Sequence, residues 1–196
     1  MLNKNAIVEA IRDRSLQISS APKLGKLIPS DEFSAWEAAN LSTLSIDLPL
    51  GTIFWAEKAN HGIAIDAYSG RTAVNTNDTT GGGFNKIEIE ENTGILLPPG
   101  RAVIAVTPFT VTLSDTLAGV ILGRATATRF GVQIATGILN PGHDGHVNIV
   151  MYNTSAKAVT LQQGKKYAQL ILHKVQGNPV SYDGQYKDGA AIPRVL

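Results

Sequence analysis

The residues best suited to chemistry lie in the segment GRATATRFGVQ at 123–133. Arg124 and Arg129 carry forked guanidinium groups that suit phosphate oxygens. Thr126 and Thr128 add hydroxyl groups, and the flanking glycines allow the backbone to approach a ligand closely. Taken alone, the segment is equally compatible with a solvated polar turn that carries two surface arginines.

Three further segments carry candidate groups. Asp47 lies inside an apolar stretch at 44–51, where it is either a functional carboxylate or a buried one that bonds backbone or an arginine. Gln169 lies in a turn and buried strand at 162–172. The third segment, GILNPGHDGHVNIVMYN at 137–153, is typical of a turn followed by a strand.

The turn of this third segment is rich in histidine. His143 and His146 have the His-x-x-His spacing that can hold zinc. On a turn that leads into a strand, however, the two side chains would point to opposite faces, so we expect no protein metal site. His143 is instead a candidate base or base-stacking group, or a simple turn residue.

Short segments rich in Val, Ile and Thr must position these groups. From Leu41 onward they are separated by Gly, Pro and Asn about every ten residues. This spacing predicts a sandwich or barrel rather than alternating strands and helices. The expected strands are at 44–48, 51–56, 86–90, 102–107, 109–113, 118–122, 146–152 and 158–161.

Two short helices are expected before the strands. The first, at 5–14, has apolar residues at helical spacing and could be capped by Asn3 or Asn5. The second, at 31–39, begins with acidic residues, and Trp36 could dock inward.

Three segments are expected outside the regular elements. NTNDTTGGGF at 75–84 has the composition of a mobile loop, although its role is not indicated. LLPPG at 96–100 predicts a turn. The stretch at 177–196 has little apolar periodicity and is expected to be a tail.

Composition limits the class of protein. The chain has 196 residues, of which 43% are hydrophobic, so it can bury one sizeable core. Seventeen Lys and Arg balance 16 Asp and Glu, which argues against a broad surface for duplex nucleic acid. It lacks cysteine, a signal peptide and an apolar run of the ~18–20 residues that span a bilayer, so we expect a cytoplasmic protein with no membrane partner.

Together the segments resemble the dCTP deaminase/dUTPase superfamily in order and spacing. The family phosphate motif, roughly G-R-S-S-x-A-R-x-G, matches 123–131, and G-x-I-D-P-G-[aromatic]-x-G-H matches 137–146. P-G-x-x-I-A-Q-L matches 163–170, and S-[VI]-D-L-x-L-G matches 45–51. The N-terminal helix and a Y-x-G-Q tail at 182–185 favour the dCTP deaminase branch, and the glycine-rich final motif of trimeric dUTPases is missing.

The resemblance implies a mainly β fold, a distorted jelly-roll-like β-barrel of the dUTPase type with short N-terminal helices. It implies a homotrimer with active sites between subunits. One domain is expected at 1–176, followed by a tail at 177–196 that closes over the site. The implied ligand is a deoxynucleoside triphosphate accompanied by Mg²⁺.

The resemblance also implies roles for individual residues. The phosphate-binding residues would be Arg124, Thr126, Arg129 and Gln169. The base-binding and lid residues would be Thr136, Tyr182 and Gln185.

Both usual catalytic carboxylates are altered in this chain. The proton-shuttling glutamate of the deaminases corresponds to Val150, and the water-orienting aspartate of the dUTPases corresponds to Asn140. An amide can hold a water but is no base near neutral pH. The candidates for positioning water are therefore Asn140, His143 and Asp47.

The expected function is processing of a deoxynucleoside triphosphate by an enzyme resembling dCTP deaminase, which converts dCTP to dUTP. Two alternatives stay open. One is a dUTPase-like phosphohydrolase. The other is a non-catalytic nucleotide-binding, regulatory or structural trimer, because Val150 and Asn140 replace the catalytic carboxylates.

Overall fold

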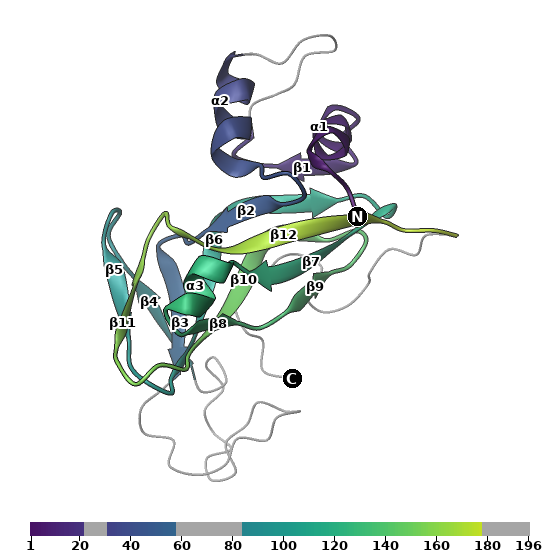
Figure 1. Cartoon of the computed structure of the whole chain (residues 1–196). Helices are drawn as coiled ribbons and strands as arrows, with labels where there is room; N and C mark the ends of the chain where they lie inside the picture. Colours follow the sequence, from purple (N-terminus) through teal and green to yellow (C-terminus); the bar gives the residue numbers. More distant parts are fainter. Residues whose placement is uncertain (22–30, 58–83, 178–196) are drawn as a thin grey trace.

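A computed structural model describes residues 1–21, 31–57 and 84–177, in which strands dominate (Figure 1). Two short helices precede most of the strands, and a third, shorter helix lies between two of them. The helices are α1 (Lys4–Arg12), α2 (Asp31–Asn40) and α3 (Ala125–Arg129). The strands are β1 (Leu16–Ile18), β2 (Ile46–Pro49), β3 (Ile53–Glu57), β4 (Phe84–Glu88), β5 (Gly94–Leu97), β6 (Ala102–Leu113), β7 (Leu117–Gly123), β8 (Val132–Ile134), β9 (Gly137–Leu139), β10 (Asp144–Asn153), β11 (Val159–Gln162) and β12 (Lys166–Lys174).

The strands of the described residues form two larger sheets and one small one. The first sheet has the order β4-β3-β6-β10-β8, with β1 paired to β6. The second has the order β2-β12-β7-β9, and β11 pairs with β5 alone. Both larger sheets contribute to one apolar core, which includes Ile149 and Met151 from β10 and Leu170 and Leu172 from β12. The predicted mainly β, jelly-roll-like fold with short N-terminal helices is confirmed.

Strand β10 shows how the sequence pattern places side chains on two faces. Val147, Ile149 and Met151 alternate along the strand and are buried in the core. Because successive side chains of a strand point to opposite faces, Asn148 and Val150 lie on the other side of the sheet. This outward face carries the position that the family resemblance assigns to the catalytic glutamate.

The strands expected at 102–107 and 109–113 are one continuous strand, β6, so that prediction was wrong. Pro108 between them has no N–H to donate, yet the strand continues because Pro108 lies in a β-bulge, where no N–H is needed for pairing. Between two successive register pairs β6 has three residues, 107–109, opposite the single β10 residue Val147, so β6 bulges here. Val147 N donates to Thr107 Oγ1 at 2.9 Å. The β-bulge therefore accommodates the proline without ending the strand.

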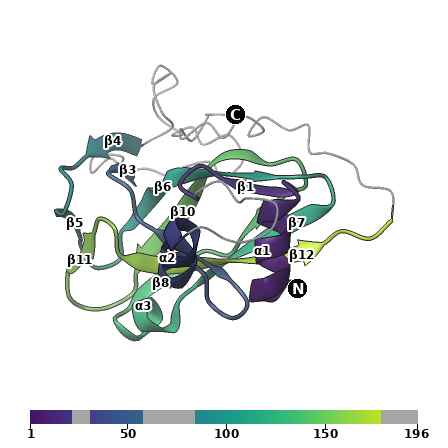
Figure 2. The same cartoon turned by 90° about the horizontal axis from the view of Figure 1, so that it is seen from above.

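The two N-terminal helices are confirmed and cover the same end of the barrel, as Figures 1 and 2 show. Asn3 caps α1, its side chain accepting a hydrogen bond from Ala6 N at 3.0 Å. In α2 the residue that docks inward is Phe33, which is fully buried. Trp36 is half-buried and packs against it, with ring centroids 5.6 Å apart, so it is not the inward-docking residue.

The three segments expected outside regular structure have different outcomes. The turn expected at 96–100 begins later, because strand β5 continues to Leu97. The loop expected at 75–84 lies outside the described residues apart from Phe84, which begins β4. The tail expected at 177–196 lies outside them apart from Gly177. Within the described parts of the chain, no helix is long and apolar enough to cross a membrane.

Candidate functional site

The phosphate-motif segment forms helix α3, which the sequence did not indicate. The helix begins where β7 ends its pairing with β12, and Arg124 N donates to Tyr167 O at 2.9 Å at that point. Ala127 is its buried residue, so the remaining side chains face outward. The helix ends at Arg129 and is followed by Phe130 and Gly131, and the φ of +80° at Gly131 suits a residue without a side chain. The fold thus presents both arginines at the surface, on a short and well-anchored element.

At the start of α3, Arg124 belongs to a charged cluster. Its Nη1 atom lies 2.7 Å from Asp47 Oδ2, and Lys166 Nζ lies 3.3 Å from the same oxygen. Asp47 pairs in register with Gln169 across β2 and β12, and Ser45 Oγ donates to Gln169 Oε1 at 3.2 Å. The sequence candidates Asp47, Arg124 and Gln169 are therefore brought together, and Asp47 is the buried, arginine-paired carboxylate that was one of its two interpretations.

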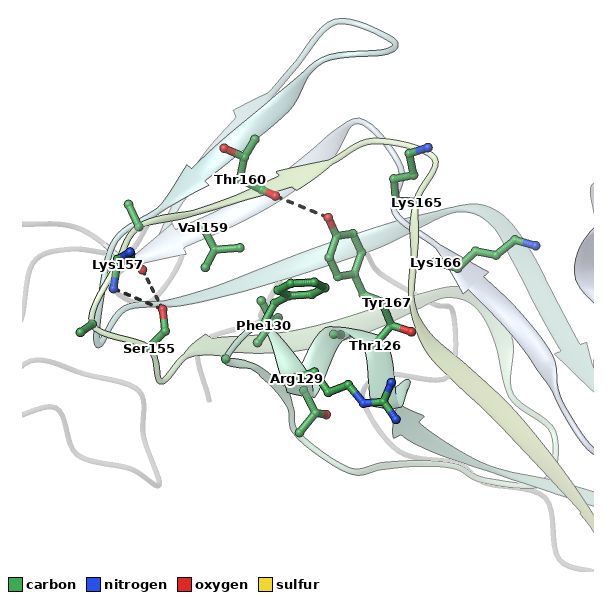
Figure 3. Close-up of a pocket in the computed structure, with 16 residues that line it drawn as sticks. Thr126, Arg129, Phe130, Ser155, Lys157, Val159, Thr160, Lys165, Lys166 and Tyr167 are labelled. Atoms are coloured by element: carbon green, nitrogen blue, oxygen red, sulfur yellow. Dashed lines mark hydrogen bonds between the residues drawn. The ribbon is translucent and has the colours of Figure 1, made fainter.

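At the other end of α3 lies an open groove of about 960 Å³ (Figure 3). Phe130, Val159 and Tyr167 gather in its middle, and the side chain of Phe130 is largely exposed, at 70%. The Tyr167 ring is fixed because its hydroxyl accepts from Gln162 N at 3.1 Å. The groove is lined by residues 126–132, 155–160 and 165–167. It includes the sequence candidates Thr126 and Arg129.

The charge around this groove has one sign. Arg129, Lys157, Lys165 and Lys166 line it, and no acidic side chain does among the residues described. Of these cations, Lys166 is paired with Asp47, whereas no described residue forms an ion pair with Arg129. The groove consequently suits a ligand that combines negative charge with an apolar or aromatic part.

Sequence reasoning missed the far side of this groove. Phe130, Tyr167 and the turn at 155–160 were not among its candidates, because only the fold brings that turn beside α3. A signal was available in Phe130, an aromatic residue next to Arg129 in an otherwise polar segment.

Asn140 and His143 lie in a tight turn on a different part of the protomer. His143 N donates to Asn140 O at 3.1 Å. The turn bonds the β6–β7 connection, because Leu113 N donates to His143 O at 2.8 Å and Gly142 N to Ser114 O at 3.4 Å. Within the described chain, no hydrogen bond or ion pair joins this turn to α3, so the structure does not bring these two candidates to the phosphate motif of the same protomer.

The His143 ring is half-buried, and its Nε2 atom is buried without a hydrogen-bond partner. Burial lowers the pKa of His143, and the backbone hydrogen bond at Gly145 and the charge of Asp144 oppose this only in part. His146 instead contacts Thr107 O through Nδ1, at 2.8 Å. Across the described residues, no group of three His, Cys, Asp or Glu side chains could hold a metal ion.

The altered glutamate position and the candidate base-binding residue lie next to each other. Ala135 N donates to Val150 O at 2.9 Å, and Thr136 follows as an exposed residue between β8 and β9. The lid candidates Tyr182 and Gln185 lie outside the described residues.

The architecture defines the class of protein. The fold matches that of 2'-deoxycytidine 5'-triphosphate deaminase from Agrobacterium tumefaciens with a TM-score of 0.59, at 12% sequence identity, over 89% of this chain and 48% of the other. At this identity the match concerns the fold alone. It is the fold of the dCTP deaminase/dUTPase superfamily, as the sequence motifs had indicated.

Within that class, the chain belongs to the dCTP deaminase-like family, whose model matches residues 3–175. It is 27% identical over 115 residues to a dCTP deaminase of Pyrobaculum calidifontis, which covers 58% of this chain and 63% of that protein. It is 28% identical over 138 residues to a dUMP-forming dCTP deaminase of Methanopyrus kandleri, with coverages of 69% and 67%. The chain therefore spans less than two thirds of the Pyrobaculum relative. The predicted superfamily and branch are confirmed.

Proposed function

We propose that this protein binds a deoxynucleoside triphosphate and processes it, as an enzyme resembling dCTP deaminase that converts dCTP to dUTP. The observation that carries this proposal is the placement of α3. Arg124 and Arg129 lie at the two ends of its single turn, one held by Asp47 and the other free beside a groove. The relatives named above are dCTP deaminases.

The charges around α3 support binding of a polyanion. The inner cluster contains one carboxylate, Asp47, and two cations, Arg124 and Lys166, so it keeps a net positive charge. Arg129 adds a second cation, and Thr126 adds an exposed hydroxyl donor. A triphosphate that spans α3 would meet charge-assisted donors along its length.

Mg²⁺ is proposed to arrive with the triphosphate rather than as a resident ion. Asp47 fits such a complex, because its Oδ1 atom is buried without a partner while Oδ2 is engaged by Arg124. A free carboxylate oxygen beside a phosphate site can accept a hydrogen bond from a metal-bound water. The residues present therefore suit the ion in the form in which the nucleotide carries it.

The catalytic step is where this chain departs from its relatives. Val150 cannot transfer a proton, and Asn140 is exposed in the turn beside His143. Because burial favours the neutral imidazole of His143, this ring is the candidate base of that turn. These substitutions favour a second candidate function, a non-catalytic protein that binds the nucleotide and regulates in response to it. A dUTPase-like phosphohydrolase is the third, with Asn140 holding the water.

A homotrimer is proposed as the working form. In one protomer the Asn140–His143 turn is bonded to the β6–β7 connection and not to α3. Assembly of several copies would allow the turn of one copy to complete the phosphate site of another. The tail at 177–196, with Tyr182 and Gln185, is proposed to close over that site.

Turnover measurements test the proposal. The purified protein is incubated with each deoxynucleoside triphosphate and Mg²⁺, and ammonia, pyrophosphate and nucleotide products are followed. Turnover that is lost in Arg129→Ala and kept in Lys174→Ala, an exposed cation at the end of β12, supports the enzyme. Tight binding without turnover supports the regulator, and neither binding nor turnover rejects both.

Two variants test whether the site is inactive only because it lacks a catalytic carboxylate. Val150→Glu restores the carboxylate of the deaminases, and Asn140→Asp restores that of the dUTPases. A regulator that keeps the ancestral site should gain ammonia release with the first variant or pyrophosphate release with the second. If neither variant changes the products that are released, the residues at positions 150 and 140 are not what prevents catalysis.

A further inference from the structure

Asn148 is a polar residue on the outward face of β10. The buried face of that strand is apolar at positions 147, 149 and 151. Asn148 and Val150 occupy the opposite face, one side-chain step of roughly 7 Å apart. Asn148 and Tyr152 are therefore the two nearest residues, on the same strand and face, to the position that carries the glutamate in the deaminases, and Asn148 is the less exposed of the two.

The amide oxygen of Asn148 is buried and has no hydrogen-bond partner. An unpaired buried acceptor destabilises a folded protein, and native proteins leave few of them without a reason. A valine or leucine at this position would avoid that cost and suit a strand better. The asparagine is thus not explained by stability of the protomer.

Asn148 lies in the middle of β10, close to the point where the pairing of β10 with β8 ends. Strand β8 pairs with β10 from Asn153 to Met151, and the pairing then ends. Ala135 still donates to Val150 O, after which the chain leaves for β9 in the other sheet. Beyond that point β10 is paired with β6 alone, so Asn148 lies beside the place where the two sheets separate.

A second unpaired polar atom lies on the same sheet face. Trp55, Ile104 and Val150 pair in register across β3, β6 and β10, so their side chains share the outward face. Trp55 is 8% exposed, and its indole N–H is buried without a partner. This face therefore combines an apolar row with one free acceptor and one free donor, which is the chemistry of a site for a planar heterocycle.

We infer that Asn148 hydrogen-bonds the edge of the nucleobase and contributes to base selection. The inference rests on the proposed function and names the part of the site that recognises the base. An asparagine amide offers an acceptor and a donor side by side, which matches adjacent donor and acceptor atoms on a pyrimidine ring. The apolar neighbours Ile104 and Val150 would strengthen such bonds by excluding water.

The test compares nucleotides with inorganic triphosphate, which has the charge but no base. Asn148→Val should weaken the affinity for dCTP or dUTP about tenfold or more, because a good hydrogen-bonded site rejects a partner without the matching group. Its affinity for inorganic triphosphate should stay unchanged. The ligand-free variant should melt at the same temperature as wild type or higher, because an unpaired oxygen is removed. Asn85→Val, at an exposed position of β4, is the matched control and should change neither affinity.

The outcomes separate this inference from the proposed function. Nucleotide affinities unchanged in Asn148→Val would overturn the inference and leave the proposed function intact. Equal loss for nucleotides and inorganic triphosphate, together with a lower melting temperature, would show a purely structural asparagine and would also overturn it. A wild-type protein that binds neither ligand would reject the proposed function, and the inference with it. Asn148→Ala provides the same comparison if the valine variant does not fold.

Discussion

Asp47 and Arg124 form an ion pair, with 2.7 Å between Oδ2 and Nη1, that joins β2 to the start of α3. The two residues are distant in sequence. Asp47 lies in β2 and Arg124 directly follows β7, and both strands are neighbours of β12. The side chain of Asp47 is 11% exposed, whereas that of Arg124 is 34% exposed. The pair therefore fixes a cation at the surface by means of a carboxylate in the protein interior.

Asp47→Asn should lower the free energy of unfolding by about 1–3 kcal/mol. The substitution leaves Arg124 and Lys166 beside a neutral amide, and loss of one partner from a partly buried pair costs more than loss of a surface pair. Urea unfolding of both proteins measures the difference. Glu37→Gln, which breaks the more exposed Lys4–Glu37 pair between α1 and α2, should cost less than about 1 kcal/mol. Equal losses in the two variants would contradict the structural role given to Asp47.

Gly131→Ala should destabilise the junction between α3 and the groove by about 2–4 kcal/mol. Its φ of +80° disfavours any side chain, and an added Cβ would lie 2.6 Å from Ser155 Cβ. Gly164→Ala is the matched control, because its φ is +75° and nothing lies within 4 Å of the added atom. The control should lower the free energy of unfolding by about 1 kcal/mol, which is the cost of placing a side chain at a positive φ without any steric contact. Thermal unfolding measures the loss of stability in each variant. Equal losses would contradict the prediction, because they would show that Ser155 moves away from the added Cβ without a cost in stability.

Stability should fall at acid pH in a way that depends on His143. Burial lowers the pKa of His143 from its ordinary value of 6.5, so the unfolded chain takes up this proton at a higher pH than the folded chain. The contribution is fully present above the unfolded pKa and is lost as the pH falls through it toward the lower pKa of the folded state. His143→Gln should flatten this part of the curve of unfolding free energy against pH. His173→Gln, at an exposed position, should leave it as in wild type, and a His143→Gln curve as steep as wild type would refute the assignment.

The pattern of the sequence was enough for most of the fold and for part of the site. Segments rich in Val, Ile and Thr, separated by Gly, Pro and Asn, predicted β2, β3, β4, β6, β7, β10, β11 and β12. The short strands β5, β8 and β9 were not predicted, because three or four residues are too few to show a strand pattern. The continuity of β6 was not predicted, because Pro108 normally ends a strand and the β-bulge that accommodates it is visible only in the register of β6 against β10. Helix α3 was not predicted either, since its short segment has too few residues for a helical period and depends on its bond to Tyr167.

The site was predictable where motif residues act together within one protomer. Asp47, Arg124 and Gln169 were found from their motifs, and neighbouring strands bring them together. Phe130 and Asn148 were missed for a different reason. Exposure of an aromatic ring and the lack of a partner for a buried amide are properties of the folded surface, and no spacing in the sequence reports them.

The measurement that tests the account most directly is the affinity of the 196-residue chain for dCTP with Mg²⁺, by titration calorimetry. Wild type and Lys174→Ala should bind alike. Arg129→Ala should weaken binding about tenfold or more, because a charge-assisted bond to phosphate is lost from a residue that has no other described ion-pair partner. The melting temperature should not change, since Arg129 lines the groove and is not part of the core. Binding that is equal in wild type and Arg129→Ala, or absent from wild type, would contradict the claim that α3 is a phosphate site.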